Sequence, residues 1–212
     1  MNGEERIRLH TEVVSAPLCP ELRLHLVTDR CPAWRMTEAQ AASIGLVEPY
    51  WAFCWPGGQA LARHLLDHPE VVRGKRVLDF GAGCAIEGLA ALKAGATSVL
   101  AADIDQVACA AARLNAGLNG LSLEVTDEDL VGTLPACDVV LAGDVFYDRD
   151  LARRGLAWLT SLSRSGLEVL IGDPARGFLD LTGLEQVSSV RALADGDSSG
   201  TVLRETGVYR IR

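Results

Sequence analysis

The stretch Arg76–Gly88, RVLDFGAGCAIEG, decides the fold of this chain. It begins with a short apolar run that ends at Asp79-Phe80, and the glycine-rich turn Gly81-Ala82-Gly83 follows. The apolar-rich segment after the turn has helical character, so the stretch predicts a strand, a tight turn and a helix. Glycine has no Cβ and lets a ligand lie against bare backbone, while the first N–H groups of the helix stay unpaired and can face that ligand. We therefore expect a ligand to bind at this turn.

Strands and helices alternate on the C-terminal side of the turn. The pattern predicts strands at 76–80, 98–102, 121–125, 138–142 and 167–171, and helices at 84–94, 105–117 and 149–164. Strands that are nearly pure apolar runs indicate a parallel sheet with helices on both faces. Two more strand-like runs, Leu184–Ala192 and Thr201–Ile211, are joined by the turn-rich linker 195–200 and predict an antiparallel pair. The predicted fold class is α/β, a doubly wound, mostly parallel seven-stranded sheet with an antiparallel C-terminal hairpin.

The N-terminal residues predict a small extension of this sheet. Alternation in Ile7-Arg8-Leu9, Val13-Val14 and Leu22–Leu26 indicates a hairpin or meander, and Thr37 is a candidate cap for a short helix over 37–42. Four aromatic residues then fall between positions 50 and 55, flanked by prolines and glycines, before a helix over 60–66. Such a segment suits a lid over a ligand, although an aromatic cluster can equally be core. We expect a single domain over 1–212, with 1–70 as extension and lid and 71–212 as core.

Composition excludes several classes of protein. A net charge of −8 argues against nucleic-acid binding and suits a basic protein or a cationic side chain as substrate. No apolar stretch is long enough to span a bilayer, and the acid-containing N-terminus is unlike a signal peptide, so we expect a cytoplasmic monomer with no membrane partner. The six cysteines occur singly, and His64 and His68 have no third ligand in view. Buried free thiols are therefore expected, and no metal site.

The glycine turn departs from the fingerprint of dinucleotide-binding proteins. Gly81 and Gly83 fit that fingerprint, but Ile86 stands where a third glycine is needed beside a pyrophosphate. The next strand is followed by Asp103, where a carboxylate can hold a ribose. A ligand with a ribose and no pyrophosphate fits better, and S-adenosylmethionine is such a ligand. A purely structural turn and an NAD-linked oxidoreductase remain as alternatives.

Three segments, VLDFGAG (77–83), AADID (101–105) and AARLNAGLNG (111–120), resemble class I S-adenosylmethionine-dependent methyltransferases. The resemblance implies a Rossmann-like fold and a set of cofactor-binding residues: Trp55, Asp79, Gly81, Gly83, Asp103, Ile104, Asp127 and Gly143. It implies that Asp103 takes both ribose hydroxyls and that Ile104 packs on the adenine. By the same resemblance, Asp127 or a neighbour meets the adenine edge.

Two further segments narrow the resemblance. GDVFYD (143–148) is similar to the D/E-x-x-Y/F signature of the seven-β-strand protein lysine methyltransferases. PYWA (49–52) and WPGGQAL (55–61) resemble the electron transfer flavoprotein β-subunit lysine methyltransferases. The resemblance implies methylation of lysines in that flavoprotein subunit. Two alternatives concern the substrate, which could be another protein such as a ribosomal protein, or a small amine. A further alternative is a protein that binds a nucleoside without catalysis.

Asp144 and Tyr147 are the candidate catalytic residues in this segment. Methyl transfer is an in-line displacement, so the enzyme must align a neutral amine with the methyl group and exclude water. A carboxylate stabilises the lysine cation, so we expect Asp144 to capture the ammonium while its proton leaves to solvent. Tyr147 is expected to form a wall of the lysine channel. The alternative is that the two residues cap and pack the helix at 149. Asp173 and Arg176 are expected to form a local ion pair.

Overall fold

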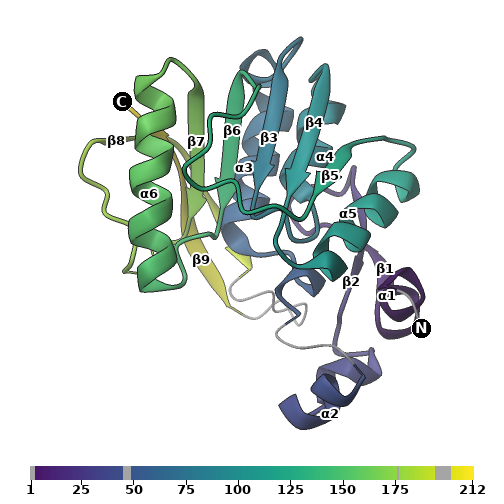
Figure 1. Ribbon diagram of the computed structural model, residues 1–212. Coiled ribbons are helices and arrows are strands. Elements are labelled where there is room, and N and C mark those ends of the chain that lie inside the picture. The colour runs from purple at the N-terminus through teal and green to yellow at the C-terminus, as the bar shows by residue number, and fades with distance from the viewer. Residues whose placement is uncertain (1–2, 45–48, 176, 194–201) are drawn as a thin grey trace.

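A seven-stranded sheet forms the centre of the molecule, which we describe from a computed structural model covering residues 3–44, 49–175, 177–193 and 202–212 (Figure 1). The strand order is β5-β4-β3-β6-β7-β9-β8. The parallel strands are β5 (Glu124–Thr126), β4 (Ser98–Ala102), β3 (Arg76–Phe80), β6 (Val139–Gly143) and β7 (Glu168–Asp173). The chain runs outward from β3 to β5 and then returns to β6 on the other side of β3. The switch point of the sheet therefore lies between β3 and β6, where open α/β sheets bind ligands.

The C-terminal strands pair antiparallel, as the sequence predicts. β9 (Leu203–Ile211) lies between β7 and β8 (Leu184–Leu193) and runs antiparallel to both. The predicted linker at 195–200 lies outside the described residues. The predicted fold class is confirmed.

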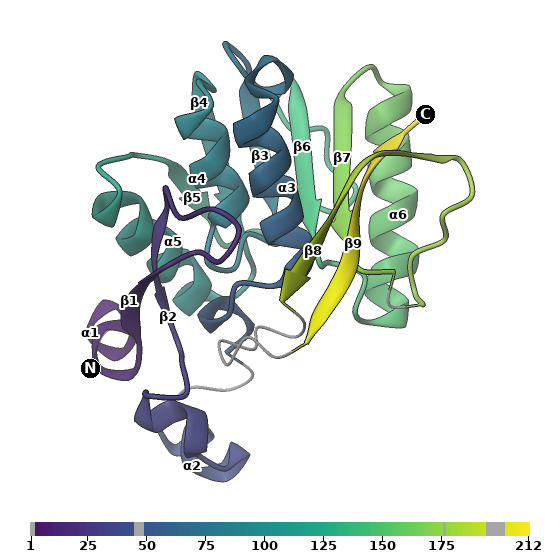
Figure 2. The ribbon, with the colours of Figure 1, turned by 180° about the vertical axis from the view of Figure 1, so that it is seen from behind.

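Helices cover both faces of the sheet. Val77 and Val139 join a buried cluster with α3 (Pro56–Asp67), α4 (Ile86–Lys93) and α5 (Gln106–Leu118). The adjacent Leu78 and Val140 point to the other face, where they join a cluster with α6 (Arg149–Arg164). Figure 2 shows α3 and α4 in front of the sheet, with α6 behind it. Strands buried on both faces explain why β3 and β6 read as continuous apolar runs.

The N-terminal elements pack beside α5 through α1 (Gly3–His10), β2 (Arg23–Leu26) and a short 3₁₀ turn at Tyr50–Ala52. The other elements of this part are β1 (Glu12–Ser15), a 3₁₀ turn at Pro32–Arg35 and α2 (Glu38–Ser43), and a third 3₁₀ turn, Pro69–Val71, follows α3. The predicted hairpin is confirmed as β1 and β2, and Thr37 caps α2 in a capping box. The extended conformation predicted for Ile7-Arg8-Leu9 is wrong, because these residues belong to α1. Glutamates in the first turn of α1 and basic residues in its last turn favour a helix through its dipole, and Ile7 is buried while Leu9 is exposed.

Helix α3 begins at Pro56, four residues before its predicted start at Ala60. Gly57 and Gly58, which suggested irregular backbone, lie in the first turn of the helix, where the helix backbone packs closely against its neighbours. A Cβ at Gly57 would lie 2.1 Å from the carbonyl oxygen of Gly172 in β7, which leaves room for glycine alone. The helix N-terminus therefore reaches the carboxyl ends of the strands. In the described part of the chain, no helix has the length and apolar character needed to cross a membrane.

Candidate active site

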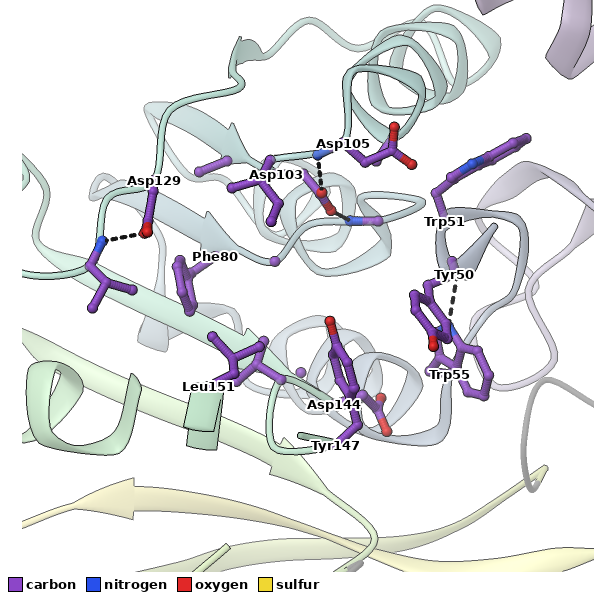
Figure 3. Close-up of a pocket in the computed structure, with 18 of the residues that line it drawn as sticks. Tyr50, Trp51, Trp55, Phe80, Asp103, Asp105, Asp129, Asp144, Tyr147 and Leu151 are labelled. Carbon is purple, nitrogen blue, oxygen red and sulfur yellow. Dashed lines mark hydrogen bonds between the residues drawn. The ribbon is translucent and has the colours of Figure 1, made fainter. Parts of the chain in front are cut away.

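A pocket of about 640 Å³ opens at the carboxyl ends of β3, β4 and β6 (Figure 3). This is the switch point of the sheet, and the volume suits a ligand of nucleoside size. Eight of the ten predicted site residues line it: Trp55, Gly81, Gly83, Asp103, Ile104, Gly143, Asp144 and Tyr147. The structure therefore brings together the glycine turn and the GDVFYD segment, which lie about 60 residues apart in the chain.

The glycine turn has the backbone conformation that its sequence requires. Gly81 and Gly83 have φ values of 71° and 51°, in the left-handed region that glycine adopts at low cost. A Cβ at Gly81 would lie 2.7 Å from Cγ1 of Val145, so a side chain here would displace the loop after β6. The N–H of Gly81 donates to the carbonyl of Ala102, which joins the turn to the end of β4. The turn is thereby held open toward the pocket.

Asp103 is fixed by two backbone donors. The N–H of Gly83 donates to Oδ2 at 2.9 Å, and the N–H of Asp105 donates to Oδ1 at 2.9 Å. Each carboxylate oxygen keeps a second lone pair that can accept a hydroxyl. Burial raises the pKa of Asp103 above its usual value, and the two N–H groups oppose that shift. Ile104 follows at the rim, where its side chain is 76% exposed.

Two predicted residues lie outside the pocket lining. Asp79 is fully buried below the glycine turn, where its Oδ2 accepts a hydrogen bond from the N–H of Gly88 at 2.9 Å. Asp127 accepts a hydrogen bond from Nε2 of Gln106 at 3.0 Å. The loop after β5 instead contributes the next two acids to the lining, Glu128 and Asp129. Because positions 127–129 are all acidic, the sequence does not indicate which of the three side chains faces the pocket.

Asp144 lies at the N-terminus of α3. The N–H of Gly58, in the first turn of α3, donates to Oδ2 of Asp144 at 2.9 Å. The backbone N–H of Asp144 donates to the carbonyl of Gly172 at 2.9 Å, and its φ is 55°. The positive end of a helix dipole favours the ionised carboxylate. The helix that begins at 149 is capped by Asp148, whose Oδ1 accepts from two backbone N–H groups. Asp144 therefore does not cap this helix.

Aromatic side chains form one wall of the pocket. The rings of Tyr50 and Tyr147 are 5.3 Å apart, and those of Tyr50 and Trp55 are 6.1 Å apart. Nε1 of Trp55 donates to the carbonyl of Tyr50 at 2.8 Å, which ties the segment together. Tyr147 and Tyr50 are about half exposed, whereas Trp51 is buried against α5. Figure 3 shows Asp144 beside Tyr147, with Tyr50 and Trp55 across from them.

The structure adds a residue that sequence reasoning missed. Arg154, on α6, lines the pocket and pairs with Asp129 at 3.1 Å, so it links α6 to the loop after β5. Nothing in the spacing of α6 distinguished this arginine from its neighbours. The predicted partner of Asp173, Arg176, lies outside the described residues, while Oδ1 of Asp173 accepts from the N–H of Ala175 at 2.6 Å.

Known proteins match this chain over the elements that build the pocket. Residues 59–143 match the family model "Ribosomal protein L11 methyltransferase (PrmA)". A Xenopus laevis protein named electron transfer flavoprotein beta subunit lysine methyltransferase is 52% identical over 171 residues, which cover 79% of this chain and 68% of that protein. The chain belongs to this lysine methyltransferase family. The human relative of the same name is 44% identical, with 79% of this chain and 64% of that protein covered. The family expected from the sequence, and with it the enzyme class of methyltransferase, is confirmed.

Solved structures share the fold. The ribosomal protein L11 methylase from Lactobacillus delbrueckii subsp. bulgaricus has a TM-score of 0.52 and 24% identity, and the match covers 74% of this chain and 78% of that one. The magnesium protoporphyrin IX methyltransferase from Synechocystis PCC 6803 has a TM-score of 0.53 and 16% identity, with 71% and 78% covered. At this identity the likeness concerns the fold.

Proposed function

We propose that this protein transfers methyl groups from S-adenosylmethionine to lysine side chains of the electron transfer flavoprotein β subunit. One observation carries the proposal. A single pocket has the glycine turn and Asp103 in one part, and Asp144 with exposed tyrosines in another. The names of the relatives support the choice of protein substrate.

The residues of the glycine turn and those that follow β4 fit S-adenosylmethionine. Asp103 would hold the ribose hydroxyls, because two backbone N–H groups already orient its carboxylate. Gly81 and Gly83 would lie against the methionine part, and Ile104 with Glu128 would border the adenine. The Synechocystis neighbour was solved with this cofactor and with S-adenosylhomocysteine, which agrees with the assignment. When bound, the cofactor supplies an electrophilic methyl group on a sulfonium.

Asp144 would bind and orient the incoming lysine. Its carboxylate is held at the N-terminus of α3, which favours the negative charge that attracts an ammonium. The same charge stabilises the protonated amine, so Asp144 is unsuited to be the general base. The proton must leave to solvent before transfer, and the partly exposed position of Asp144 leaves that route open.

The tyrosines would shape the channel for the amine. Tyr147 and Tyr50 present half-exposed rings beside Asp144. An aromatic face attracts ammonium groups, including methylated ones that keep their charge. The wall therefore allows the product of one transfer to stay for another.

The decisive experiment is transfer of a labelled methyl group from S-adenosylmethionine to purified proteins. We expect the flavoprotein β subunit to be labelled on lysine, as mapped by mass spectrometry, and ribosomal protein L11 to stay unlabelled. Labelling of L11 in place of the flavoprotein would contradict the substrate assignment. Calorimetry should show binding of S-adenosylhomocysteine and none of NADH, and the reverse result would contradict the cofactor. Cytoplasmic location, a monomeric state and the absence of nucleic-acid partners stay predictions.

A further inference from the structure

Two buried acids lie directly below the pocket, and the mechanism above uses neither of them. Asp79 on β3 is 0% exposed and Glu87 on α4 is 3% exposed. Their carboxyl groups are within hydrogen-bonding reach of each other. Among the described residues, neither forms an ion pair with an arginine, lysine or histidine. Two adjacent carboxylates buried without a cation cannot both keep a negative charge, so the pair must retain a proton.

The hydrogen bonds indicate which acid carries this proton. Oδ2 of Asp79 already accepts from the N–H of Gly88, which favours its ionised form. Oδ1 of Asp79 is buried, and no N–H or O–H donor of the described residues reaches it, so a proton on Glu87 supplies a donor for this carboxylate. Burial and the negative charges of Asp79 and Asp144 raise the pKa of Glu87 well above its usual value. The pKa of Asp79 is raised to about 6, because burial outweighs the lowering effect of the hydrogen bonds from Glu87 and from the N–H of Gly88.

Glu87 also touches the backbone that holds Asp144. A Cβ added at Gly143 would lie 1.8 Å from Oε1 of Glu87, so this oxygen packs directly on the chain at the end of β6. A Cβ added at Gly58 would lie 3.3 Å from the same oxygen. Gly143 precedes Asp144, and Gly58 donates the N–H that Asp144 accepts. Glu87 therefore supports both backbone segments that fix the Asp144 carboxylate.

We propose that Glu87 is a positioning residue for methyl transfer, a neutral acid that donates its proton to Asp79 and buttresses the Gly58–Asp144 contact. Glu87 thereby limits the buried pair to one negative charge. If Glu87 were also ionised, its negative charge would repel that of Asp144. This repulsion would favour the protonated form of Asp144, which attracts an ammonium less strongly. The role of Asp144 rests on the proposed function, whereas the protonated state of Glu87 does not.

Other groups that face the pair come from each neighbouring element. Asp103 faces Asp79 from the end of β4, Asp144 faces Glu87 from the loop after β6, and the thiol of Cys84, the residue after the glycine turn, faces Glu87. Helix α3 contributes the backbone at Gly58. All these side chains are acidic or neutral. They therefore reinforce the need for a proton on the pair.

Glu87→Gln and Glu87→Ala separate the proposed role from simple packing. Glutamine keeps the shape and can donate an N–H to Asp79, so kcat/KM should stay within about threefold of wild type. Alanine removes the donor and the buttress, so kcat/KM should fall at least about tenfold. Glu87→Ala and Glu87→Gln both lack the titration of Glu87, so their free energies of unfolding in urea can be compared against pH. The loss of stability as Asp79 ionises should extend to higher pH in Glu87→Ala than in Glu87→Gln, because Asp79 loses the hydrogen bond that lowers its pKa. Leu89→Ala, also buried on α4, is the matched control and should lower stability without altering its pH dependence.

Infrared spectroscopy tests the proton directly and needs no substrate. At about pH 7.5, wild type should show the carbonyl stretch of a protonated carboxylic acid, and Glu87→Gln should lose it. Absence of that band from wild type, or a fall in kcat/KM in Glu87→Gln as large as that in Glu87→Ala, would overturn the proposal. If Glu87→Ala fails to fold, the band and the kcat/KM of Glu87→Gln still decide. Failure of the labelling assay on the flavoprotein would instead refute the substrate, with the unfolding and infrared readouts unaffected.

Discussion

Asp79→Asn should change stability in a way that depends on pH. The pKa of Asp79 lies at about 6 in the folded protein, against 3.8 as its ordinary value, and burial is the first cause. A raised carboxyl pKa means that the folded state binds the proton more tightly, so stability falls as pH rises from about 4 to about 6. The whole displacement corresponds to at most about 3 kcal/mol at neutral pH. Asparagine carries no charge and escapes this cost, while its amide oxygen can still accept from Gly88.

The measurement is the free energy of unfolding in urea, followed by tryptophan fluorescence at about pH 4 and about pH 7.5. The difference between Asp79→Asn and wild type should be more favourable to the variant at the higher pH by about 2 kcal/mol. Any misfit of the amide is independent of pH and cancels in this comparison. Asp138→Asn is a control, because Arg76 lowers the pKa of Asp138 to about 2, so its contribution to stability is lost only below about pH 4 and the variant should differ from wild type nearly equally at the two pH values. The reasoning is refuted if Asp79→Asn differs from wild type equally at both pH values.

Four further outcomes follow from the site. Asp103→Ala should weaken S-adenosylhomocysteine binding by about 10- to 100-fold in calorimetry, because charge-assisted hydrogen bonds contribute about 1.5–3 kcal/mol. In wild type, the same affinity should fall as pH drops through the raised pKa of Asp103, since the protonated acid is a poorer acceptor. Asp144→Ala should abolish labelling of protein yet keep that binding, and lost binding would move Asp144 into the cofactor site. Ala85→Gly should raise the free energy of unfolding by about 1 kcal/mol, because Ala85 has a φ of 60°; a lower value would show that the turn is unstrained.

Local pattern was enough to predict most elements of this fold. Residues 139–142 form a continuous apolar run and all four are buried, so both faces of this strand are covered. A short run of this kind is typical of a central strand in a parallel sheet. Helix α6 has the predicted bounds 149–164, because Asp148 caps its start and its apolar stripe is unbroken. Helix α3 shows where this reasoning stops. Gly57 marks close contact with β7 and Gly58 marks close contact with α4, and contact between distant segments cannot be seen in local sequence.

Part of the pocket lining could also be predicted from the sequence. Asp103, Gly81 and Gly83 line the pocket as expected, because each follows the end of a strand. Asp79 ends the same kind of run, yet it points below the turn into the core. Glu87 was read only as a helical residue after the turn. Its burial against Asp79 and the backbone of Gly143 depends on how α4 packs on the sheet.

The backbone at Asp144 has a consequence for engineering this enzyme. With a φ of 55°, position 144 admits glycine, asparagine and aspartate at low cost and penalises other side chains by about 1–2 kcal/mol. The residue at position 144 must therefore supply a negative charge and also adopt the left-handed backbone conformation. Glutamate would keep the charge and lose the conformation, whereas asparagine would keep the conformation and lose the charge. A redesign that aims at an uncharged or anionic acceptor can begin from Asp144→Asn, while one that needs a long cationic side chain here must first rebuild the loop after β6.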